Sequence, residues 1–147
     1  MTFNDDRLRD RLKALADFLP VLEDPHFACG EMIYPKHKAP NVFYLPFYHL
    51  SAEASAFMKM TYEKVWVLKD FDWGRWMFSP EAVRLRDDPE ALASAGPEQL
   101  ARLLTVVVRQ ERFCEGSFAE AHESGLLVGI VRRAAALLAK LDGGTLD

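Results

Sequence analysis

Apolar residues recur every three or four positions in at least four segments of this chain, and this spacing constrains its fold more than any other feature. Such spacing places side chains on one face of an α-helix. In the first such segment, from Asp5 to about Leu19, the apolar positions are Leu8, Leu12, Leu15 and Leu19. The last runs from Gly125 to about Leu141, and its first two turns are apolar all round, which is typical of a helix in the centre of a domain. The sequence therefore predicts a mainly α fold.

Helix start signals divide the middle of the chain. Ser51, Ser79 and Asp88 are residue types that cap helices, and the last two precede a proline and a glutamate, which favour a first helical turn. The apolar stripe after Ser51 continues to Leu68. A longer helix is predicted from about Glu98, because its apolar positions have helical spacing, although the segment LLTVVV has the branched composition of a buried strand.

Residues 24–50 break this helical pattern. Four prolines in this segment exclude a long helix, while EMIY and NVFYLPFY flank the turn-like PKHKAPN and favour a small hairpin. Pro46 would interrupt the second strand or confine it to an edge. We expect one compact domain over residues 1–147, with about five to six helices, an irregular or β-hairpin insert near residues 24–50, and a frayed tail at residues 143–147.

Composition excludes several classes of function. The formal net charge of −4 argues against a broad nucleic-acid-binding face. The mixed-charge start lacks a secretory signal, and the longest apolar run, GLLVGIV, is far shorter than the ~20 residues of a membrane span. We therefore expect a soluble, cytoplasmic protein with no nucleic-acid or membrane partner. Two cysteines are too few for a disulfide framework, so Cys29 and Cys114 are expected to be free.

Catalytic and metal-binding patterns are incomplete. His26 and Cys29 have H-x-x-C spacing without a second close pair of ligands, so the sequence predicts no structural metal and no cofactor. A cysteine nucleophile could be built from Cys114, with His122 as base and Glu123 or Glu120 as the orienting group. The simpler interpretation of Cys114 is a buried, inert thiol at a helix end.

The stretch RQERFCEGSF, residues 109–118, is predicted to join two helices. Glycine suits the left-handed backbone that ends many helices, so Gly116 is expected to adopt it, and Ser117 and Glu120 have capping-box spacing. Arg112 is expected to fork onto Glu123 or Glu120, or onto carbonyls at the helix end.

The segment LLTVVVRQERFCEGSFAEAHESGLLVGIVRRAAAL, residues 103–137, resembles the signature of a family of small bacterial proteins known as domain of unknown function 6508. That signature contains an E-R-F-C-(E/D)-G core followed by E-S-G and an apolar helix. FDWGRW resembles the family's F-D-W-x-x-W, and CGEM is similar to its F-G-E-W, with Cys29 and Met32 replacing phenylalanine and tryptophan. The resemblance implies a shared fold and brings no known activity. It singles out Trp73, Trp76, Arg109, Arg112, Phe113, Cys114, Gly116, Glu123 and Gly125.

The sequence favours a non-enzymatic protein that binds a partner protein or a small ligand, with RFCEG as a structural helix junction. The candidate binding residues are Trp73, Trp76, Arg109 and Arg112. The alternative is an enzyme of unidentified reaction at the same junction, using Cys114 with His122 or the neighbouring arginines and glutamates. A homo-oligomer is also possible.

Overall fold

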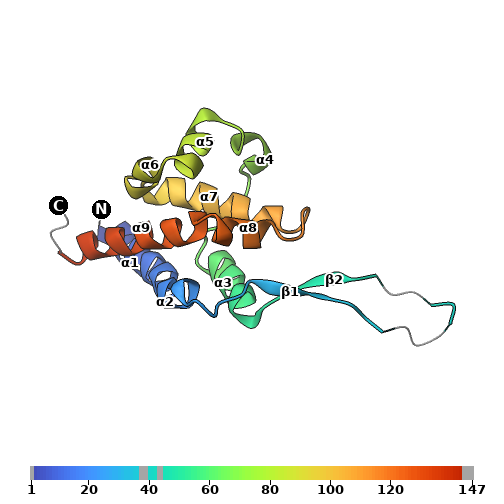
Figure 1. Ribbon diagram of the computed structural model, residues 1–147. Helices are drawn as coiled ribbons and strands as arrows, with labels where there is room; N and C mark the ends of the chain where they lie inside the picture. The colour runs from blue at the N-terminus through green and yellow to red at the C-terminus, as the bar shows by residue number, and fades with distance from the viewer. Residues whose placement is uncertain (1, 37–39, 43–44, 144–147) are drawn as a thin grey trace.

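The two ends of the chain form a pair of helices that lie side by side. In the computed structural model, which describes residues 2–36, 40–42 and 45–143, α1 (Thr2–Ala16) packs along α9 (Leu126–Leu141) (Figure 1). Leu12 and Leu15 of α1 are fully buried in this contact. The first helix ends three residues before the predicted Leu19, and α2 (Leu19–Glu23) then begins, with proline in its first turn. The predicted tail beyond Gly143 lies outside the described residues.

The final helix lies between two layers of helices. Figure 1 shows α7 (Pro97–Gln110) on one side of α9, with α1 and α3 (Ala52–Glu63) on the other. The fully buried residues of α9 are Leu127, Ile130, Val131 and Ala134. Their burial confirms that the early turns of this helix pass through the core.

The segment LLTVVV is helical, as its spacing predicted, and it forms the buried part of α7. Three short helices cover α7: α4 (Trp73–Trp76), α5 (Pro80–Asp87) and α6 (Pro89–Ala93). The predicted caps are in place, since Ser79 accepts the amide of Ala82 over 3.2 Å and Asp88 accepts that of Glu90 over 3.0 Å. The two tryptophans are the first and last residues of the one-turn helix α4.

The helix after Ser51 is shorter than predicted. It ends at Glu63, and Val65 has a positive φ of 57° and an exposed side chain, so the apolar stripe does not continue to Leu68. The chain turns there because Trp66 enters the core, where it is fully buried and its Nε1 donates to the Arg11 carbonyl over 3.1 Å. The guanidinium of Arg11 lies over the Trp66 ring, 4.4 Å from its centroid, and its burial lowers its pKa.

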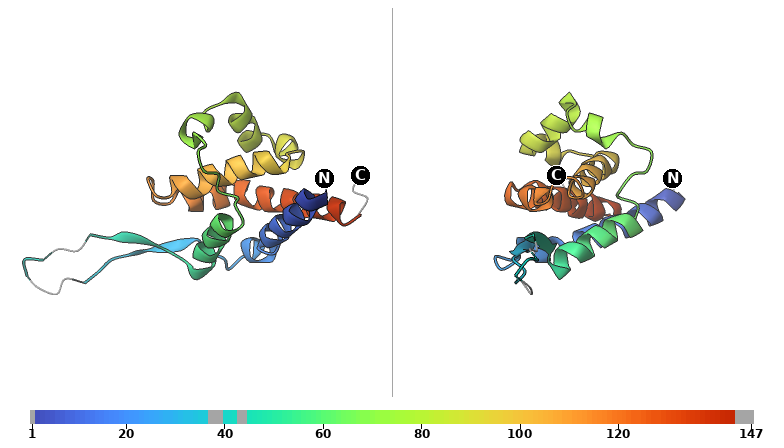
Figure 2. Two further views of the ribbon diagram at one scale, coloured as in Figure 1. Left: turned by 180° about the vertical axis from the view of Figure 1, so that it is seen from behind. Right: turned by 90° about the vertical axis from the view of Figure 1, so that its right-hand side faces the viewer.

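The proline-rich insert forms the predicted hairpin. β1 (Gly30–Ile33) pairs antiparallel with β2 (Phe47–Leu50), with Met32 opposite Tyr48 in the register. β2 starts directly after Pro46, so the proline lies at the beginning of the strand and not within it. The hairpin points away from the helices in Figure 1 and in the left view of Figure 2. We call its described residues, 30–36, 40–42 and 45–50, the hairpin arm. The mainly α fold with a small hairpin insert is therefore confirmed.

Candidate functional site

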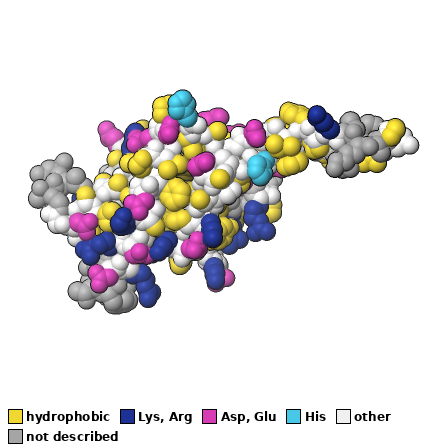
Figure 3. All heavy atoms as spheres, turned by 90° about the horizontal axis from the view of Figure 1, so that it is seen from below, with side chains coloured by type: hydrophobic (Ala, Val, Ile, Leu, Met, Phe, Trp, Pro, Cys, Tyr) yellow, Lys and Arg dark blue, Asp and Glu magenta, His cyan; other side chains and the backbone are white. Residues whose placement is uncertain are grey.

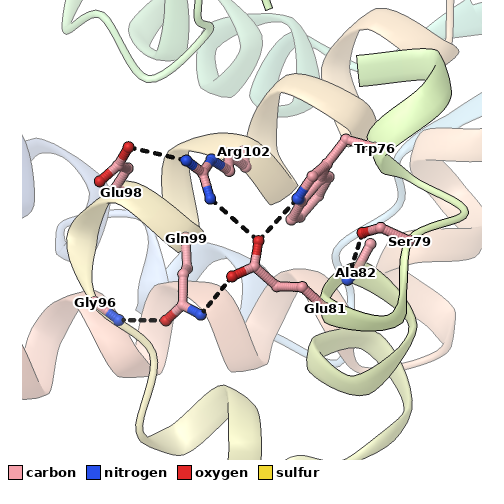
Figure 4. A network of polar contacts seen from close by, with 8 residues as sticks. All are labelled: Trp76, Ser79, Glu81, Ala82, Gly96, Glu98, Gln99 and Arg102. Carbon is pink, nitrogen blue, oxygen red and sulfur yellow. Dashed lines mark hydrogen bonds and ion pairs between the residues drawn. The ribbon is translucent and has the colours of Figure 1, made fainter. Parts of the chain in front are cut away.

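The carboxylate of Glu81, in the first turn of α5, joins side chains from α4 and α7 (Figure 4). Trp76 Nε1 and Arg102 Nη1 donate to its Oε1 over 2.8 and 3.1 Å, and Gln99 Nε2 donates to its Oε2 over 3.2 Å. The hydrogen bond from Trp76 is the main cause that lowers the pKa of Glu81, against an opposing effect of desolvation. The polar group of Trp76 is thus used inside the protein, where it holds α4 to α5.

Trp73, the other tryptophan predicted to bind, contacts the helix junction. Its ring lies 6.0 Å from that of Phe113, measured between centroids, and Phe113 is 78% exposed. This contact brings FDWGRW and RFCEG together in space, although Trp73 and Phe113 are 40 positions apart in the sequence (113 − 73). Together Trp73 and Phe113 form a small apolar surface beside α7.

The RFCEG stretch is a helix junction in which a carboxylate closes the turn. α7 ends at Gln110, and α8 (Ser117–Glu123) begins after Gly116, which has the predicted left-handed backbone with φ of 93°. The carboxylate of Glu111 accepts the amides of Gly116 over 3.2 Å and of Phe118 over 2.9 Å. The predicted capping box of Ser117 and Glu120 is wrong, because Glu111 takes this role and the buried Ser117 hydroxyl has no hydrogen-bond partner among the described residues.

The two arginines of the junction do not form the expected ion pairs. Arg112 is exposed, and within the described part of the chain its side chain has no hydrogen bond or ion pair with Glu120, Glu123 or a helix-end carbonyl. Arg109 is half-buried, and its Nε is buried without a hydrogen-bond partner among the described residues. The expected contact of Arg112 with Glu120, Glu123 or a helix-end carbonyl is therefore wrong, and the turn is closed instead by the Glu111 carboxylate.

The residues of the candidate Cys–His site have separate surroundings. Cys114 is exposed, which contradicts the expected burial, because it lies in the turn after α7 rather than inside the helix contact. The Nε2 of His122 is 2.9 Å from the Leu22 carbonyl, and its ring packs edge-on against Phe27, with centroids 4.8 Å apart. Glu123 is exposed at the end of α8. Of the described residues, none bridges Cys114 and His122 by a hydrogen bond.

The base of the hairpin arm lies near the same junction. Burial, followed by the charges of Glu123 and Glu111, raises the pKa of the Cys29 thiol to about 11. Partial burial and then the Cys29 group raise the pKa of Tyr48, with smaller effects of the two glutamates. Ser51 donates its amide to the Cys29 carbonyl over 2.8 Å and so fixes the end of the hairpin at the start of α3. The helix junction and the base of the hairpin arm therefore lie close to each other in the protein.

The hairpin arm exposes large apolar side chains on both of its faces. Ile33 and Phe47 are opposite each other on one face, and Met32 and Tyr48 on the other. Phe47 and Met32 are exposed, and beyond the strands Tyr34 and Leu45 are 72% and 84% exposed. Apolar side chains lie along the arm in the view of Figure 3. This differs from a usual two-stranded surface, in which one face is apolar and packed while the other is polar.

The described residues contain no group of three or more histidine, cysteine, aspartate or glutamate side chains placed to hold a metal ion. In the same part of the chain, no helix is both long and apolar enough to cross a membrane. Both cysteines are free thiols, as expected, with Cys29 buried and Cys114 exposed.

A family model described as a family of unknown function, DUF6508, matches residues 7–140. The chain belongs to DUF6508. No curated protein and no solved structure matches it. The DUF6508 match covers the helices, the hairpin arm and the junction together, so the resemblance inferred from RFCEG and FDWGRW is confirmed as membership.

Sequence reasoning missed three features of this DUF6508 chain. The sequence marks Glu81 only as a first-turn acid, because the side chains of Gln99 and Arg102 that it binds come from another helix. It gives Glu111 no separate role, because the amides that Glu111 accepts are five and seven positions away, beyond one helical turn. The exposed arm residues Tyr34 and Leu45 were assigned to the hairpin without a role. A signal was available for the arm, since consecutive positions of its strands are apolar where a half-buried strand would alternate.

Proposed function

We propose that this protein is a soluble, non-enzymatic binding protein, and that its hairpin arm binds a partner protein. The observation that carries the proposal is the exposure of large apolar side chains on both faces of the arm, above all Tyr34 and Leu45. A two-stranded hairpin alone is only marginally stable in water, and it gains stability when a further strand or a helix covers it. Contiguous exposed apolar surface of this kind marks interaction sites.

The shape of the arm favours a protein over a small molecule. Small ligands bind in concave pockets, whereas the arm projects from the helices (Figure 1). Among the described strands, β1 and β2 pair only with each other, so the outer edge of each has unpaired backbone groups. A partner strand can add to such an edge by main-chain hydrogen bonds, with alternate side chains providing specificity.

The helix junction supports the arm in this proposal. α8 begins at the amides that Glu111 caps, and its Phe118 packs against Phe57 of α3, with ring centroids 5.9 Å apart. The arm leaves the body between α2 and α3, so a fixed α8 also fixes the arm's base. RFCEG therefore acts as a structural junction, and Trp73 with Phe113 remains a secondary apolar surface beside it.

The test compares the wild type with two variants in which exposed apolar side chains are replaced by serine. The arm variant carries Tyr34→Ser and Leu45→Ser, and the control carries Phe78→Ser on the body, where Phe78 is 76% exposed. Each purified protein is immobilised and incubated with a lysate of the native cells, and captured proteins are quantified by mass spectrometry. Self-association is measured in parallel by sedimentation, because a second copy of the chain is one possible partner.

We expect a specific protein, or a second copy of this chain, to bind the wild type and Phe78→Ser. Binding of the purified partner to the arm variant should be at least about tenfold weaker, since two exposed aromatic and aliphatic anchors are lost. Equal capture by all three proteins, together with no self-association, would show that the arm is not the binding surface.

A further inference from the structure

A cavity of about 390 Å³ lies between α5, α6 and α9, on the opposite side of the helical body from α1. Its volume is in the range of small-molecule pockets, which are about 300–1,000 Å³ and mostly apolar. The apolar side chains that line it are Leu85, Pro89, Leu92, Ala93, Leu126 and Ala136. Leu85 and Leu92 are buried in the core, so the wall is part of the rigid packing of the helices.

The close approach of α6 to α9 fixes the floor of this cavity. A Cβ atom added at Gly129 would lie 2.6 Å from Cδ2 of Leu92, so the Leu92 side chain of α6 packs directly on the backbone of α9 at this glycine. Gly125 and Ser124, at the start of α9, line the same cavity. The cavity is therefore built by the fold, and it does not depend on the hairpin arm.

The charged lining of the cavity is entirely positive. Arg86, Arg132 and Arg133 line it, and no aspartate or glutamate belongs to its described lining, although the chain carries a formal net charge of −4. The charged lining of a neighbouring cavity, formed by α5 and α6 with the start of α7, is mainly negative and consists of Glu81, Asp88 and Glu90 with one arginine, Arg84. The contrast shows that positive charge is concentrated at the first cavity.

The hydrogen bonds and ion pairs that these three arginines form within the protein leave part of their positive charge free to bind a ligand. Arg132 binds Glu23, which neutralises it. Arg86 donates to the Met77 carbonyl over 3.3 Å, and its Nε lies 3.8 Å from Asp87. Arg133 donates from Nε to the Ala95 carbonyl over 2.7 Å.

Arg133 forms no ion pair with a described carboxylate. Its Nε bond to a backbone carbonyl positions the guanidinium without neutralising it. Arg133 and Arg86, which has only a loose ion pair, are therefore the two positive groups that can face a ligand.

We propose that this cavity binds a small amphipathic carboxylate, with the apolar part against Leu85, Leu92 and Leu126 and the carboxylate at Arg86 and Arg133. A guanidinium donates two parallel hydrogen bonds to a carboxylate, and binding of an alkyl chain in the cavity removes apolar surface from water. The apolar wall and the positive rim match the two halves of such a molecule. This site is separate from the hairpin arm, and it does not rest on the function proposed for the arm.

The experiment uses isothermal titration calorimetry of the full chain with three probes of equal chain length: sodium octanoate, octanol and octylammonium chloride. Octanoate should bind with one saturable site, octanol about tenfold more weakly, and octylammonium without measurable heat, because only the anion meets Arg86 and Arg133. Equal affinity for octanoate and octanol, or no saturable binding of octanoate, would overturn the proposal.

Three variants locate the site. Arg86→Met with Arg133→Met should weaken octanoate binding about tenfold and leave octanol unchanged. Ala93→Trp, at an exposed position of the wall, should fill the cavity and abolish binding of both probes. The matched control is Arg84→Met, because Arg84 is on the same helix but lines the acidic cavity, and it should bind octanoate as the wild type does.

Far-UV circular dichroism and urea melts show whether each variant is folded. If the double variant unfolds, Arg86→Met alone decides, since it loses one exposed side chain with its weak backbone contact and its loose ion pair to Asp87. The arm variant Tyr34→Ser with Leu45→Ser should bind octanoate like the wild type. Loss of octanoate binding in the arm variant, or its retention in both arginine variants and in Ala93→Trp, would exclude this cavity as the site.

Discussion

The helical body and the hairpin arm contain the same kinds of apolar residues, but they use them in opposite ways. In the body, Trp66, Phe57 and Phe118 are fully buried. In the arm, Tyr34 and Leu45 are 72% and 84% exposed, and Met32 and Phe47 are exposed on opposite faces of the strand pair. The fold explains the buried apolar residues of the body, whereas it does not bury Tyr34 and Leu45 of the arm, which is why we propose that the arm binds a partner.

The largest expected difference between the two regions concerns loss of an apolar side chain. Phe118→Ala should lower the free energy of unfolding by about 3–5 kcal/mol, because it leaves a cavity in the core. Leu45→Ala, in the arm, should change it by less than about 0.5 kcal/mol, since Leu45 is exposed. Urea melts of the two variants and the wild type measure both changes.

A Leu45→Ala variant destabilised as strongly as Phe118→Ala would break the comparison. It would mean that the arm folds against the body or against another copy in solution, so that Leu45 is buried there. Repeating the melts at several protein concentrations distinguishes these cases, because only association makes the midpoint depend on concentration.

A smaller loss of stability is expected when the Glu111 cap of α8, the helix that supports the base of the arm, is removed. Glu111→Ala should destabilise the protein by about 1–2 kcal/mol, because the amides of Gly116 and Phe118 lose their acceptor. The matched control is Glu115→Ala, which removes an exposed carboxylate at the same junction. If both variants are as stable as the wild type, the carboxylate cap contributes nothing and the junction is held by packing alone.

The Glu81 network of the body should give a pH-dependent effect of less than about 1 kcal/mol, because the carboxylate is partly exposed. The folded protein lowers the pKa of Glu81 below its ordinary 4.5. Its contribution is therefore present above that value and is lost as the pH falls through the folded pKa. Glu81→Gln should be less stable than the wild type in urea melts at about pH 7 and equal to it near pH 3. A difference that grows on acidification would contradict this sign.

The smallest effect is expected for Arg112. Arg112→Ala and Arg112→Lys should each change the free energy of unfolding by less than about 0.5 kcal/mol, because the side chain is exposed and unpaired in the described structure. Arg102→Ala is the matched control, since Arg102 binds both Glu81 and Glu98 and should cost more. If Arg112→Ala is clearly destabilised, Arg112 does form the ion pair that the sequence predicted.

The sequence by itself determined the local structure of this protein. Helical spacing identified the main helices, and the cap residues Ser51, Ser79 and Asp88 accept the amides expected of them. Gly116 has the left-handed backbone that its position predicted. These features could be predicted because helix periodicity and capping involve residues within about four positions of one another.

Only the tertiary structure decided which side chains meet across segments. Glu81 binds Gln99 and Arg102, which are 18 and 21 positions away, and no local pattern encodes that choice. The two free thiols differ in burial, with Cys29 enclosed and Cys114 exposed, because one lies where the arm joins the body and the other in an open turn. The arm's projection from the helices is likewise a property of how segments pack, since the same strands could have been covered by another helix.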